Sequence, residues 1–202
     1  QIGAAIQNST EGQSESRIVQ RCPSDSKRKS TRITGIQTMN YYTFEIDGEK
    51  VGFFEYEDNQ GVLYQKASMQ IDGQCLEFPF WVKHDGKDIL AYKSGDQEFV
   101  SLSQEENAIP SSALLLFVND LEKSPNRSFE LINEGTGELV GTVTFTREGN
   151  KIQSLVNGVN DNYFVLAGEK IIEFGWGGGA ISRWVSTREE AVAGTYWETP
   201  RG

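Results

Sequence analysis

The sequence predicts an all-β protein built from two similar halves. Three observations carry this prediction: apolar and polar side chains alternate along short segments, Gly beside Asp or Asn punctuates the chain, and residues 44–118 are echoed by residues 129–197. Alternation with a period of two is typical of half-buried strands, and Asp-Gly and Asn-Gly pairs favour tight hairpins. We therefore expect an antiparallel barrel or a two-sheet sandwich made of two tandem meanders, with one or two short helices.

The internal repeat sets the predicted domain organisation. Its matching segments include 44–46 with 129–131, 48–52 with 137–141, and 86–92 with 168–174. Colinear matches of this kind indicate two copies of one supersecondary unit, related by a pseudo-twofold. We expect one duplicated β domain over residues 36–202, with copy one at about 39–118 and copy two at about 127–200. Residues 1–35 are polar and basic, and we expect a disordered arm there.

In the first copy, short strands alternate with turns. Tyr42, Phe44 and Ile46 alternate with polar residues, and Asp47-Gly48 then signals a hairpin. Further strands are expected near residues 51–56, 62–71, 75–82, 89–92 and 99–102, with turns at 58–61, 72–73, 85–86 and 94–96. Strands of this length and spacing are typical of an antiparallel meander.

The second copy repeats the pattern, and short helices are expected where the alternation stops. Its strands are predicted at residues 129–132, 139–147, 152–156, 163–167, 171–176 and 181–185. Residues 111–118 read as either a strand or a short helix capped by serine. The corresponding segment of copy two, 189–193, is rich in Ala and Glu and also favours a helix.

Charge and composition exclude some function classes. The formal net charge is −10, although residues 1–35 carry six basic and three acidic residues. An acidic body repels phosphate backbones, so we expect no nucleic-acid partner. The longest apolar run, Ala113–Val118, is far below the roughly 20 residues of a membrane span. The two cysteines, Cys22 and Cys75, fit a disulfide in an exported protein or free thiols in the cytosol. We expect a secreted or periplasmic protein, with a cytoplasmic location as the alternative.

Candidate catalytic and metal-binding groups are sparse. His84, the only histidine, lies beside a predicted turn and reads as a surface residue. A single histidine with two distant cysteines does not make a standard zinc site, so we expect no metal and no cofactor. Glu105-Glu106 and Glu189-Glu190 are paired acids at matching positions of the two copies. Paired carboxylates can hydrolyse glycosidic bonds, but acids at the start of a helix are also favoured by its dipole. We name no catalytic residue.

The most unusual local string is the glycine-rich segment 175–179, which surrounds a tryptophan. It lacks the P-loop Lys-Ser/Thr and the dinucleotide spacing, so nucleotide binding is not expected. Glycines beside a large ring leave room for a ligand, or they allow a tight crossing of the backbone. Under the first reading, the ligand site lies where the halves meet, and its residues are Trp81, Trp176, Gly177, Gly178 and Trp184.

The sequence therefore favours binding over catalysis. The turn and strand pattern is similar to that of curved-sheet carriers of the bacterial envelope and of lipocalin-like barrels, without a diagnostic motif of either. We expect either a structural or protein-interaction domain, or a carrier or sensor of an apolar small molecule bound at the seam of the repeats. A hydrolase using the paired carboxylates is the alternative. The partner would be an apolar small molecule or a protein, and the oligomeric state stays open.

Overall fold

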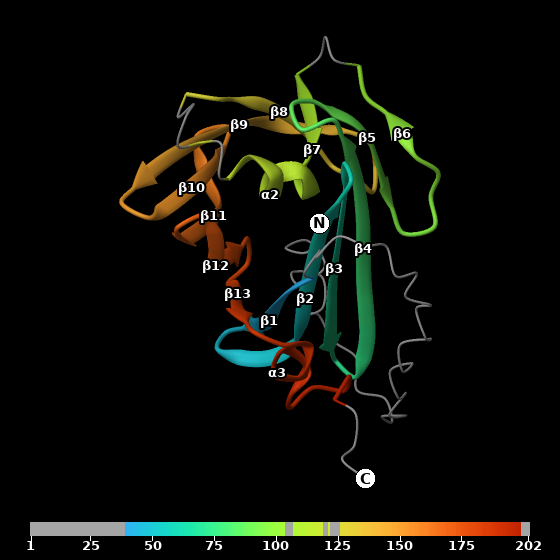
Figure 1. The fold of residues 1–202 in the computed structure, drawn as a ribbon, viewed down its shortest axis with the longest axis vertical. Coiled ribbons are helices and arrows are strands. Elements are labelled where there is room, and N and C mark those ends of the chain that lie inside the picture. The colour runs from blue at the N-terminus through green and yellow to red at the C-terminus, as the bar shows by residue number, and fades with distance from the viewer. Residues whose placement is uncertain (1–38, 104–106, 119–120, 122–125, 199–202) are drawn as a thin grey trace.

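The computed structural model describes residues 39–103, 107–118, 121 and 126–198 (Figure 1). Its strands form one 13-stranded sheet, in the order β6-β5-β4-β3-β2-β1-β13-β12-β11-β10-β9-β8-β7. The predicted all-β class is confirmed. The end strands β6 and β7 are not paired with each other, so the described strands do not close into a barrel. The arm at residues 1–35 lies outside the described residues.

The first half of the sheet is an antiparallel meander. Its strands are β1 (Asn40–Ile46), β2 (Glu49–Asn59), β3 (Val62–Ile71), β4 (Gln74–His84), β5 (Ile89–Ser94) and β6 (Val100–Ser101). Asp47-Gly48, Gln60-Gly61 and Asp72-Gly73 form two-residue hairpin loops, and both residues of each pair have positive φ. Positive φ at both central positions is the geometry of a type I′ turn, which matches the twist of the flanking strands.

The second half is a meander with the same sequential order. Its strands are β8 (Phe129–Ile132), β9 (Leu139–Glu148), β10 (Lys151–Val156), β11 (Val159–Ala167), β12 (Lys170–Trp176) and β13 (Ala180–Val185). The hairpin at Asn157-Gly158 repeats the positive-φ pair of the first half. A shared strand order is what an internal duplication requires. A meander is also a common arrangement, so the duplication itself stays a prediction.

The two meanders join along one seam, where β1 pairs antiparallel with β13. On the outer face, Arg183 on β13 bonds both Glu45 on β1 and Glu173 on β12. The Tyr163 hydroxyl on β11 donates to Glu173 at 2.9 Å. Burial and this hydrogen bond raise the pKa of Tyr163 to about 12. A continuous series of polar side-chain contacts thus crosses the seam, from β1 through β13 and β12 to β11.

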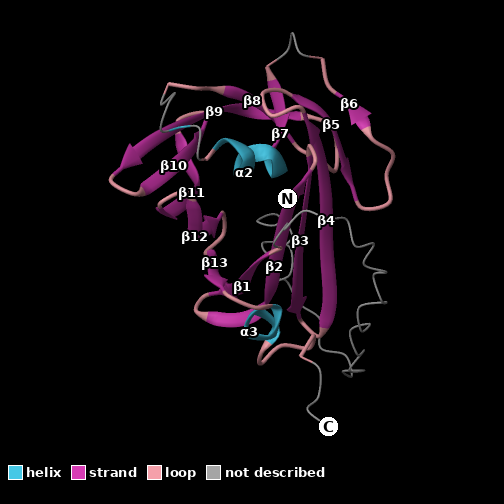
Figure 2. Cartoon of the chain, in the orientation of Figure 1, coloured by secondary structure: helices cyan, strands magenta, loops and turns pink. Residues whose placement is uncertain are grey.

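The segment between the halves lies on the concave side of the sheet. It contains β7 (Ala108–Pro110), the 3-10 helix η3 (Ser111–Ala113) and α2 (Leu114–Phe117). β7 pairs in parallel with β8, an element that the alternation did not predict. Figures 1 and 2 show α2 between the two halves. The helical reading of residues 111–118 is correct, but serine capping is wrong, because the N-cap residue is Pro110 and no side chain caps η3.

A second helix packs on the opposite face of the sheet. α3 (Arg188–Val192) confirms the predicted helix near 189–193, and the Thr187 side chain caps it by accepting from the Glu190 amide. Ala191, Val192 and Trp197 form a small core with Phe53 of β2. The Lys50 ammonium donates to the carbonyls of Glu190 and Ala193 at 2.9 and 2.7 Å, where the helix ends. Cations at a helix C-terminus are stabilising, so Lys50 fixes α3 to β2.

Cys75 lies on β4 and is disulfide-bonded. Cys22, the other cysteine of the chain, lies outside the described residues. On the same outer face, the Lys66 ammonium lies 3.6 Å from Glu55 and 3.4 Å from Glu77. Its charge is therefore balanced within the sheet.

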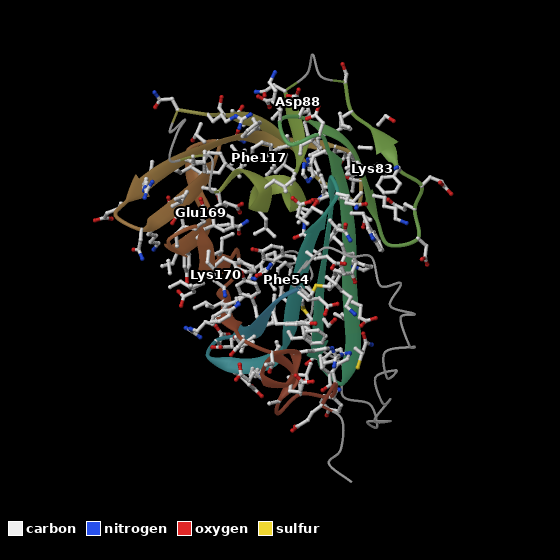
Figure 3. The ribbon with its side chains drawn as sticks, viewed as in Figure 1. Phe54, Lys83, Asp88, Phe117, Glu169 and Lys170 are labelled. Atoms are coloured by element: carbon white, nitrogen blue, oxygen red, sulfur yellow. The ribbon has the colours of Figure 1, made fainter. Side chains whose placement is uncertain are left out.

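The main core fills the concave side and is rich in aromatic rings. Tyr42, Phe44 and Phe54 are fully buried on β1 and β2, and they meet Phe174 and Trp176 from β12. The ring centroids lie 4.9–5.9 Å apart, mostly in edge-to-face geometry. The Tyr42 hydroxyl donates to the Ile171 carbonyl across the seam at 2.8 Å, and burial raises its pKa far above the ordinary range. Figure 3 shows Phe54 in the interior between the halves.

Candidate ligand-binding site

A cavity of about 380 Å³ lies on the concave side of the sheet. Its lining comes from the first half (Phe54, Gln65, Ala67, Phe80), from η3 and α2 (Ser111, Ser112, Leu114, Leu115), and from the second half (Leu131, Asn133, Glu134, Val140, Val156, Asp161, Asn162, Phe164, Phe174, Gly175, Trp176, Gly177, Gly178). The volume lies within the range of about 300–1,000 Å³ that is typical of small-molecule sites. The cavity is therefore shared between the halves and the segment that links them.

One wall of the cavity is aromatic, and we call it the aromatic wall: Phe54, Phe164, Phe174 and Trp176. The Trp176 ring lies 5.3 Å from Phe54 and 4.9 Å from Phe174, measured between centroids. Its indole N–H donates to the Ser182 hydroxyl at 3.0 Å. Because the one polar group of the ring is satisfied, its faces and edges are free to contact apolar groups.

The same cavity also has a polar set of lining residues that we call the serine pole: Gln65, Ser111, Ser112 and Glu134. The Ser111 hydroxyl donates to the two Glu134 carboxylate oxygens at 2.9 and 2.8 Å, and the Ser112 amide also donates to Glu134. Gln65 donates from Nε2 to the Ser112 carbonyl at 2.6 Å. η3 is thus held from both halves of the sheet, by β3 on one side and by the loop after β8 on the other.

A second polar corner lies at the β10–β11 and β12–β13 ends of the cavity. Asn162 accepts from the Gly177 amide through Oδ1 at 3.0 Å, and its carbonyl accepts from Gln153 and Ser154. Burial raises the pKa of the neighbouring Asp161, although part of that side chain reaches solvent. The corner holds the glycine-rich turn against β11.

The glycines of segment 175–179 are explained mostly by the fold. A Cβ on Gly175 would meet the Tyr163 ring at 2.0 Å, so this glycine lets the two strands pack. Gly178 and Gly179 have φ of 86° and 80°, a conformation that other residues adopt at a cost. At Gly177 an added Cβ would lie 3.7 Å from Asp161, an ordinary contact. Only Gly177 therefore lacks an evident architectural reason to be glycine.

The structure brings three of the five predicted site residues together. Trp176, Gly177 and Gly178 line the cavity. Trp184 lies on β13 opposite Tyr42, with the Lys170 ammonium 3.0 Å from its ring centroid, and it is not among the described lining residues. Trp81 alternates with the inward-facing Phe80 and Val82, so it lies on the opposite face, beside Tyr64 at 5.3 Å.

Several lining residues gave no signal in the sequence. Phe54 and Phe174 lie in predicted strands, but a strand prediction does not separate a cavity wall from a filled core. Gln65 lies on β3, Ser112 on η3 and Glu134 in the loop after β8, and no local spacing connects them. Their convergence comes from the way the linking segment folds back onto the concave side.

The other candidate groups have structural partners. His84 is 12% exposed and is not a free surface residue. Its Nε2 lies 2.8 Å from Asp58 and its Nδ1 accepts from the Gly86 amide at 3.1 Å, so both ring nitrogens are engaged. The Glu190 carboxylate accepts from the Ser186 amide and hydroxyl, which favours helix capping over catalysis. Glu105-Glu106 lies outside the described residues.

In the described part of the chain, no group of three or more His, Cys, Asp or Glu side chains is arranged to hold a metal ion. Among the same residues, no helix is long and apolar enough to cross a bilayer. Comparison with protein-family models, curated proteins and solved structures found no match to this chain.

Proposed function

We propose that this protein binds an apolar or amphipathic small molecule in the cavity between the two halves, as a carrier or a sensor. The observation that carries the proposal is the combination of a 380 Å³ cavity, an aromatic wall and a small set of convergent polar groups. Mostly apolar cavities with a few placed polar groups are typical of small-molecule sites. The aromatic wall supplies contact area, and the polar groups orient the ligand.

Filling part of the cavity with a larger side chain should weaken ligand binding without unfolding the protein. Ala67 is buried on β3 and lines the cavity, whereas Ala167 is exposed at the end of β11. We expect Ala67→Leu to weaken the binding of an apolar fluorescent probe at least about tenfold, because the larger side chain occupies ligand volume. Titration of probe fluorescence measures this, and circular dichroism checks the fold.

The matched control is Ala167→Leu, which adds the same atoms outside the cavity and should bind the probe like the wild type. If the wild type and both variants bind the probe with equal affinity, the probe binds outside the cavity. No saturable binding to the wild type by any apolar probe, together with no ligand in native mass spectra of protein from its own host, would remove the proposal.

A second candidate function is protein interaction. Leu139 is 64% exposed at the start of β9, and Val159 is 70% exposed at the start of β11, next to the Asn157-Gly158 hairpin. Exposed apolar groups of this size favour a docking surface. If this surface joins copies of the chain, Val159→Ser should lower self-association in sedimentation velocity and leave probe binding unchanged.

The disulfide at Cys75 supports a location in an oxidising compartment. We propose a secreted or periplasmic protein on this ground. Such a location agrees with the carriage of an apolar molecule through water, which requires the ligand to be shielded.

A further inference from the structure

The charged side chains that line the cavity are both acidic. Glu134 and Asp161 contribute carboxylates, and the described lining contains no Lys, Arg or His. Glu134 is 3% exposed, and it accepts hydrogen bonds from the neutral groups of Ser111 and Ser112. No described cationic side chain forms an ion pair with it. A buried charge without a counter-charge is costly. The cavity therefore favours a ligand that brings a positive charge.

The Ser112 hydroxyl indicates a second property of the ligand, a hydrogen-bond donor. Its oxygen is buried, and among the described residues it has no hydrogen-bond partner, although Ser112 lines the cavity. The main chain of Ser112 is fully used: its amide donates to Glu134 and its carbonyl accepts from Gln65. Buried hydroxyls without a partner are rare and call for an explanation. A ligand N–H next to Glu134 would satisfy it.

We propose that the cavity takes an amphipathic amine, with its ammonium N–H groups at the serine pole and its apolar body against the aromatic wall. This inference rests on the proposed function and adds the charge and the donor chemistry of the ligand. The ammonium donates to a Glu134 oxygen and to the Ser112 hydroxyl. Aromatic faces also attract cations, so the wall tolerates the charged end during binding. A carboxylate head group, as in a fatty acid, would meet like charge.

A matched series of ten-carbon probes tests the head group. Decylammonium, decyltrimethylammonium, 1-decanol and decanoate are titrated at neutral pH below their micelle concentrations, with calorimetry and tryptophan fluorescence as readouts. Decylammonium should bind about tenfold or more tightly than decanoate, because only the ammonium makes charge-assisted hydrogen bonds to Glu134. Decyltrimethylammonium should lie between them, because it has the charge but no N–H.

Two variants separate charge from hydrogen bonding. Glu134→Gln should weaken both cations about tenfold or more and leave 1-decanol unchanged, with exposed Glu169→Gln as its control. Ser112→Ala should weaken decylammonium several-fold and leave decyltrimethylammonium unchanged, with exposed Ser101→Ala as its control. Ser112→Ala removes a hydroxyl without a described partner, so it tests the proposal even if Glu134→Gln destabilises η3.

The outcomes separate the two proposals. Preference for decylammonium that depends on Glu134 and Ser112 supports the amine site. If 1-decanol binds but decanoate binds as tightly as decylammonium, the amine assignment is overturned and the carriage of apolar molecules stands. If no probe binds saturably, the proposed function fails and the amine site fails with it.

Discussion

Gly175 shows how one missing side chain permits the packing of two strands. Its position on β12 is directly opposite Tyr163 on β11, and a Cβ there would overlap the tyrosine ring. We expect Gly175→Ala to lower the free energy of unfolding by about 1–3 kcal/mol, because the half-buried Tyr163 ring has to move. Urea unfolding followed by tryptophan fluorescence measures the change.

Gly177→Ala is the matched control, two residues along the same segment. An added methyl group would lie at an ordinary contact distance from Asp161, so the stability should change by no more than about 0.5 kcal/mol. Gly178 is unsuitable as a control, because its φ of 86° strains any other residue. Equal losses at Gly175 and Gly177 would contradict the assigned role of Gly175.

Site residues that stand together in the sequence could be predicted, whereas site residues that only folding brings together could not. The glycine-rich segment 175–179 stood out in the sequence, and Gly175, Trp176, Gly177 and Gly178 line the cavity. Trp81 was also predicted to line the site, but strand alternation places it on the other face of the sheet. Glu134 and Ser112 meet only after the chain has crossed from one half to the other.

Among the elements, α3 is a short helix that depends on its caps. Its first turn uses Thr187 and Glu190 reciprocally: the Thr187 hydroxyl accepts from the Glu190 amide, and the Glu190 carboxylate accepts from Ser186. These bonds resemble a capping box. Hydrogen bonds from the Ser186 amide and hydroxyl hold the pKa of Glu190 below its ordinary value.

The lowered pKa of Glu190 makes this cap dependent on pH. The stabilisation by the carboxylate is complete above the unfolded glutamate pKa of about 4.3, and it is lost as the pH falls through the lower pKa of the folded protein. We therefore expect Glu190→Gln to be less stable than the wild type at about pH 7, with the difference shrinking near about pH 2.5. Thermal unfolding of both proteins at the two pH values measures it. A difference that is constant with pH would contradict the capping role of the charge.

Strands and turns could be predicted where neighbouring residues alone determine the backbone conformation. Asp47-Gly48 and Asp72-Gly73 form hairpins because those residue pairs adopt positive φ readily, and β3 and β8 have the predicted bounds. β7 was missed because three residues paired in parallel leave no alternation to detect. The prediction that serine caps the helix at residues 111–118 is wrong, because the Ser111 hydroxyl donates instead to Glu134, a partner from another part of the chain.

The whole molecule is a curved sheet whose halves meet at a single hydrogen-bonded seam. The sequence predicted the strands and their class, since both follow from alternation and turns. It did not predict how the strands are joined into one open sheet, because strand pairing between distant segments has no local signature. The two halves pair directly between β1 and β13, while β8 pairs with β7 of the linking segment and not with β6.

The seam also has a consequence for the order of folding. Neighbouring strands within each meander pair over short loops, whereas the Arg183–Glu45 pair that crosses the seam joins residues 138 positions apart. Long loops close late because their entropy must be lost before contacts form. We therefore expect Arg183→Gln to speed unfolding with little effect on the refolding rate, whereas a change in the turn at Gly73, such as Gly73→Val, slows refolding. Stopped-flow experiments in urea measure the refolding and the unfolding rates of both variants. If Arg183→Gln slows refolding as much as Gly73→Val does, β1 and β13 pair early and the seam is part of the folding nucleus.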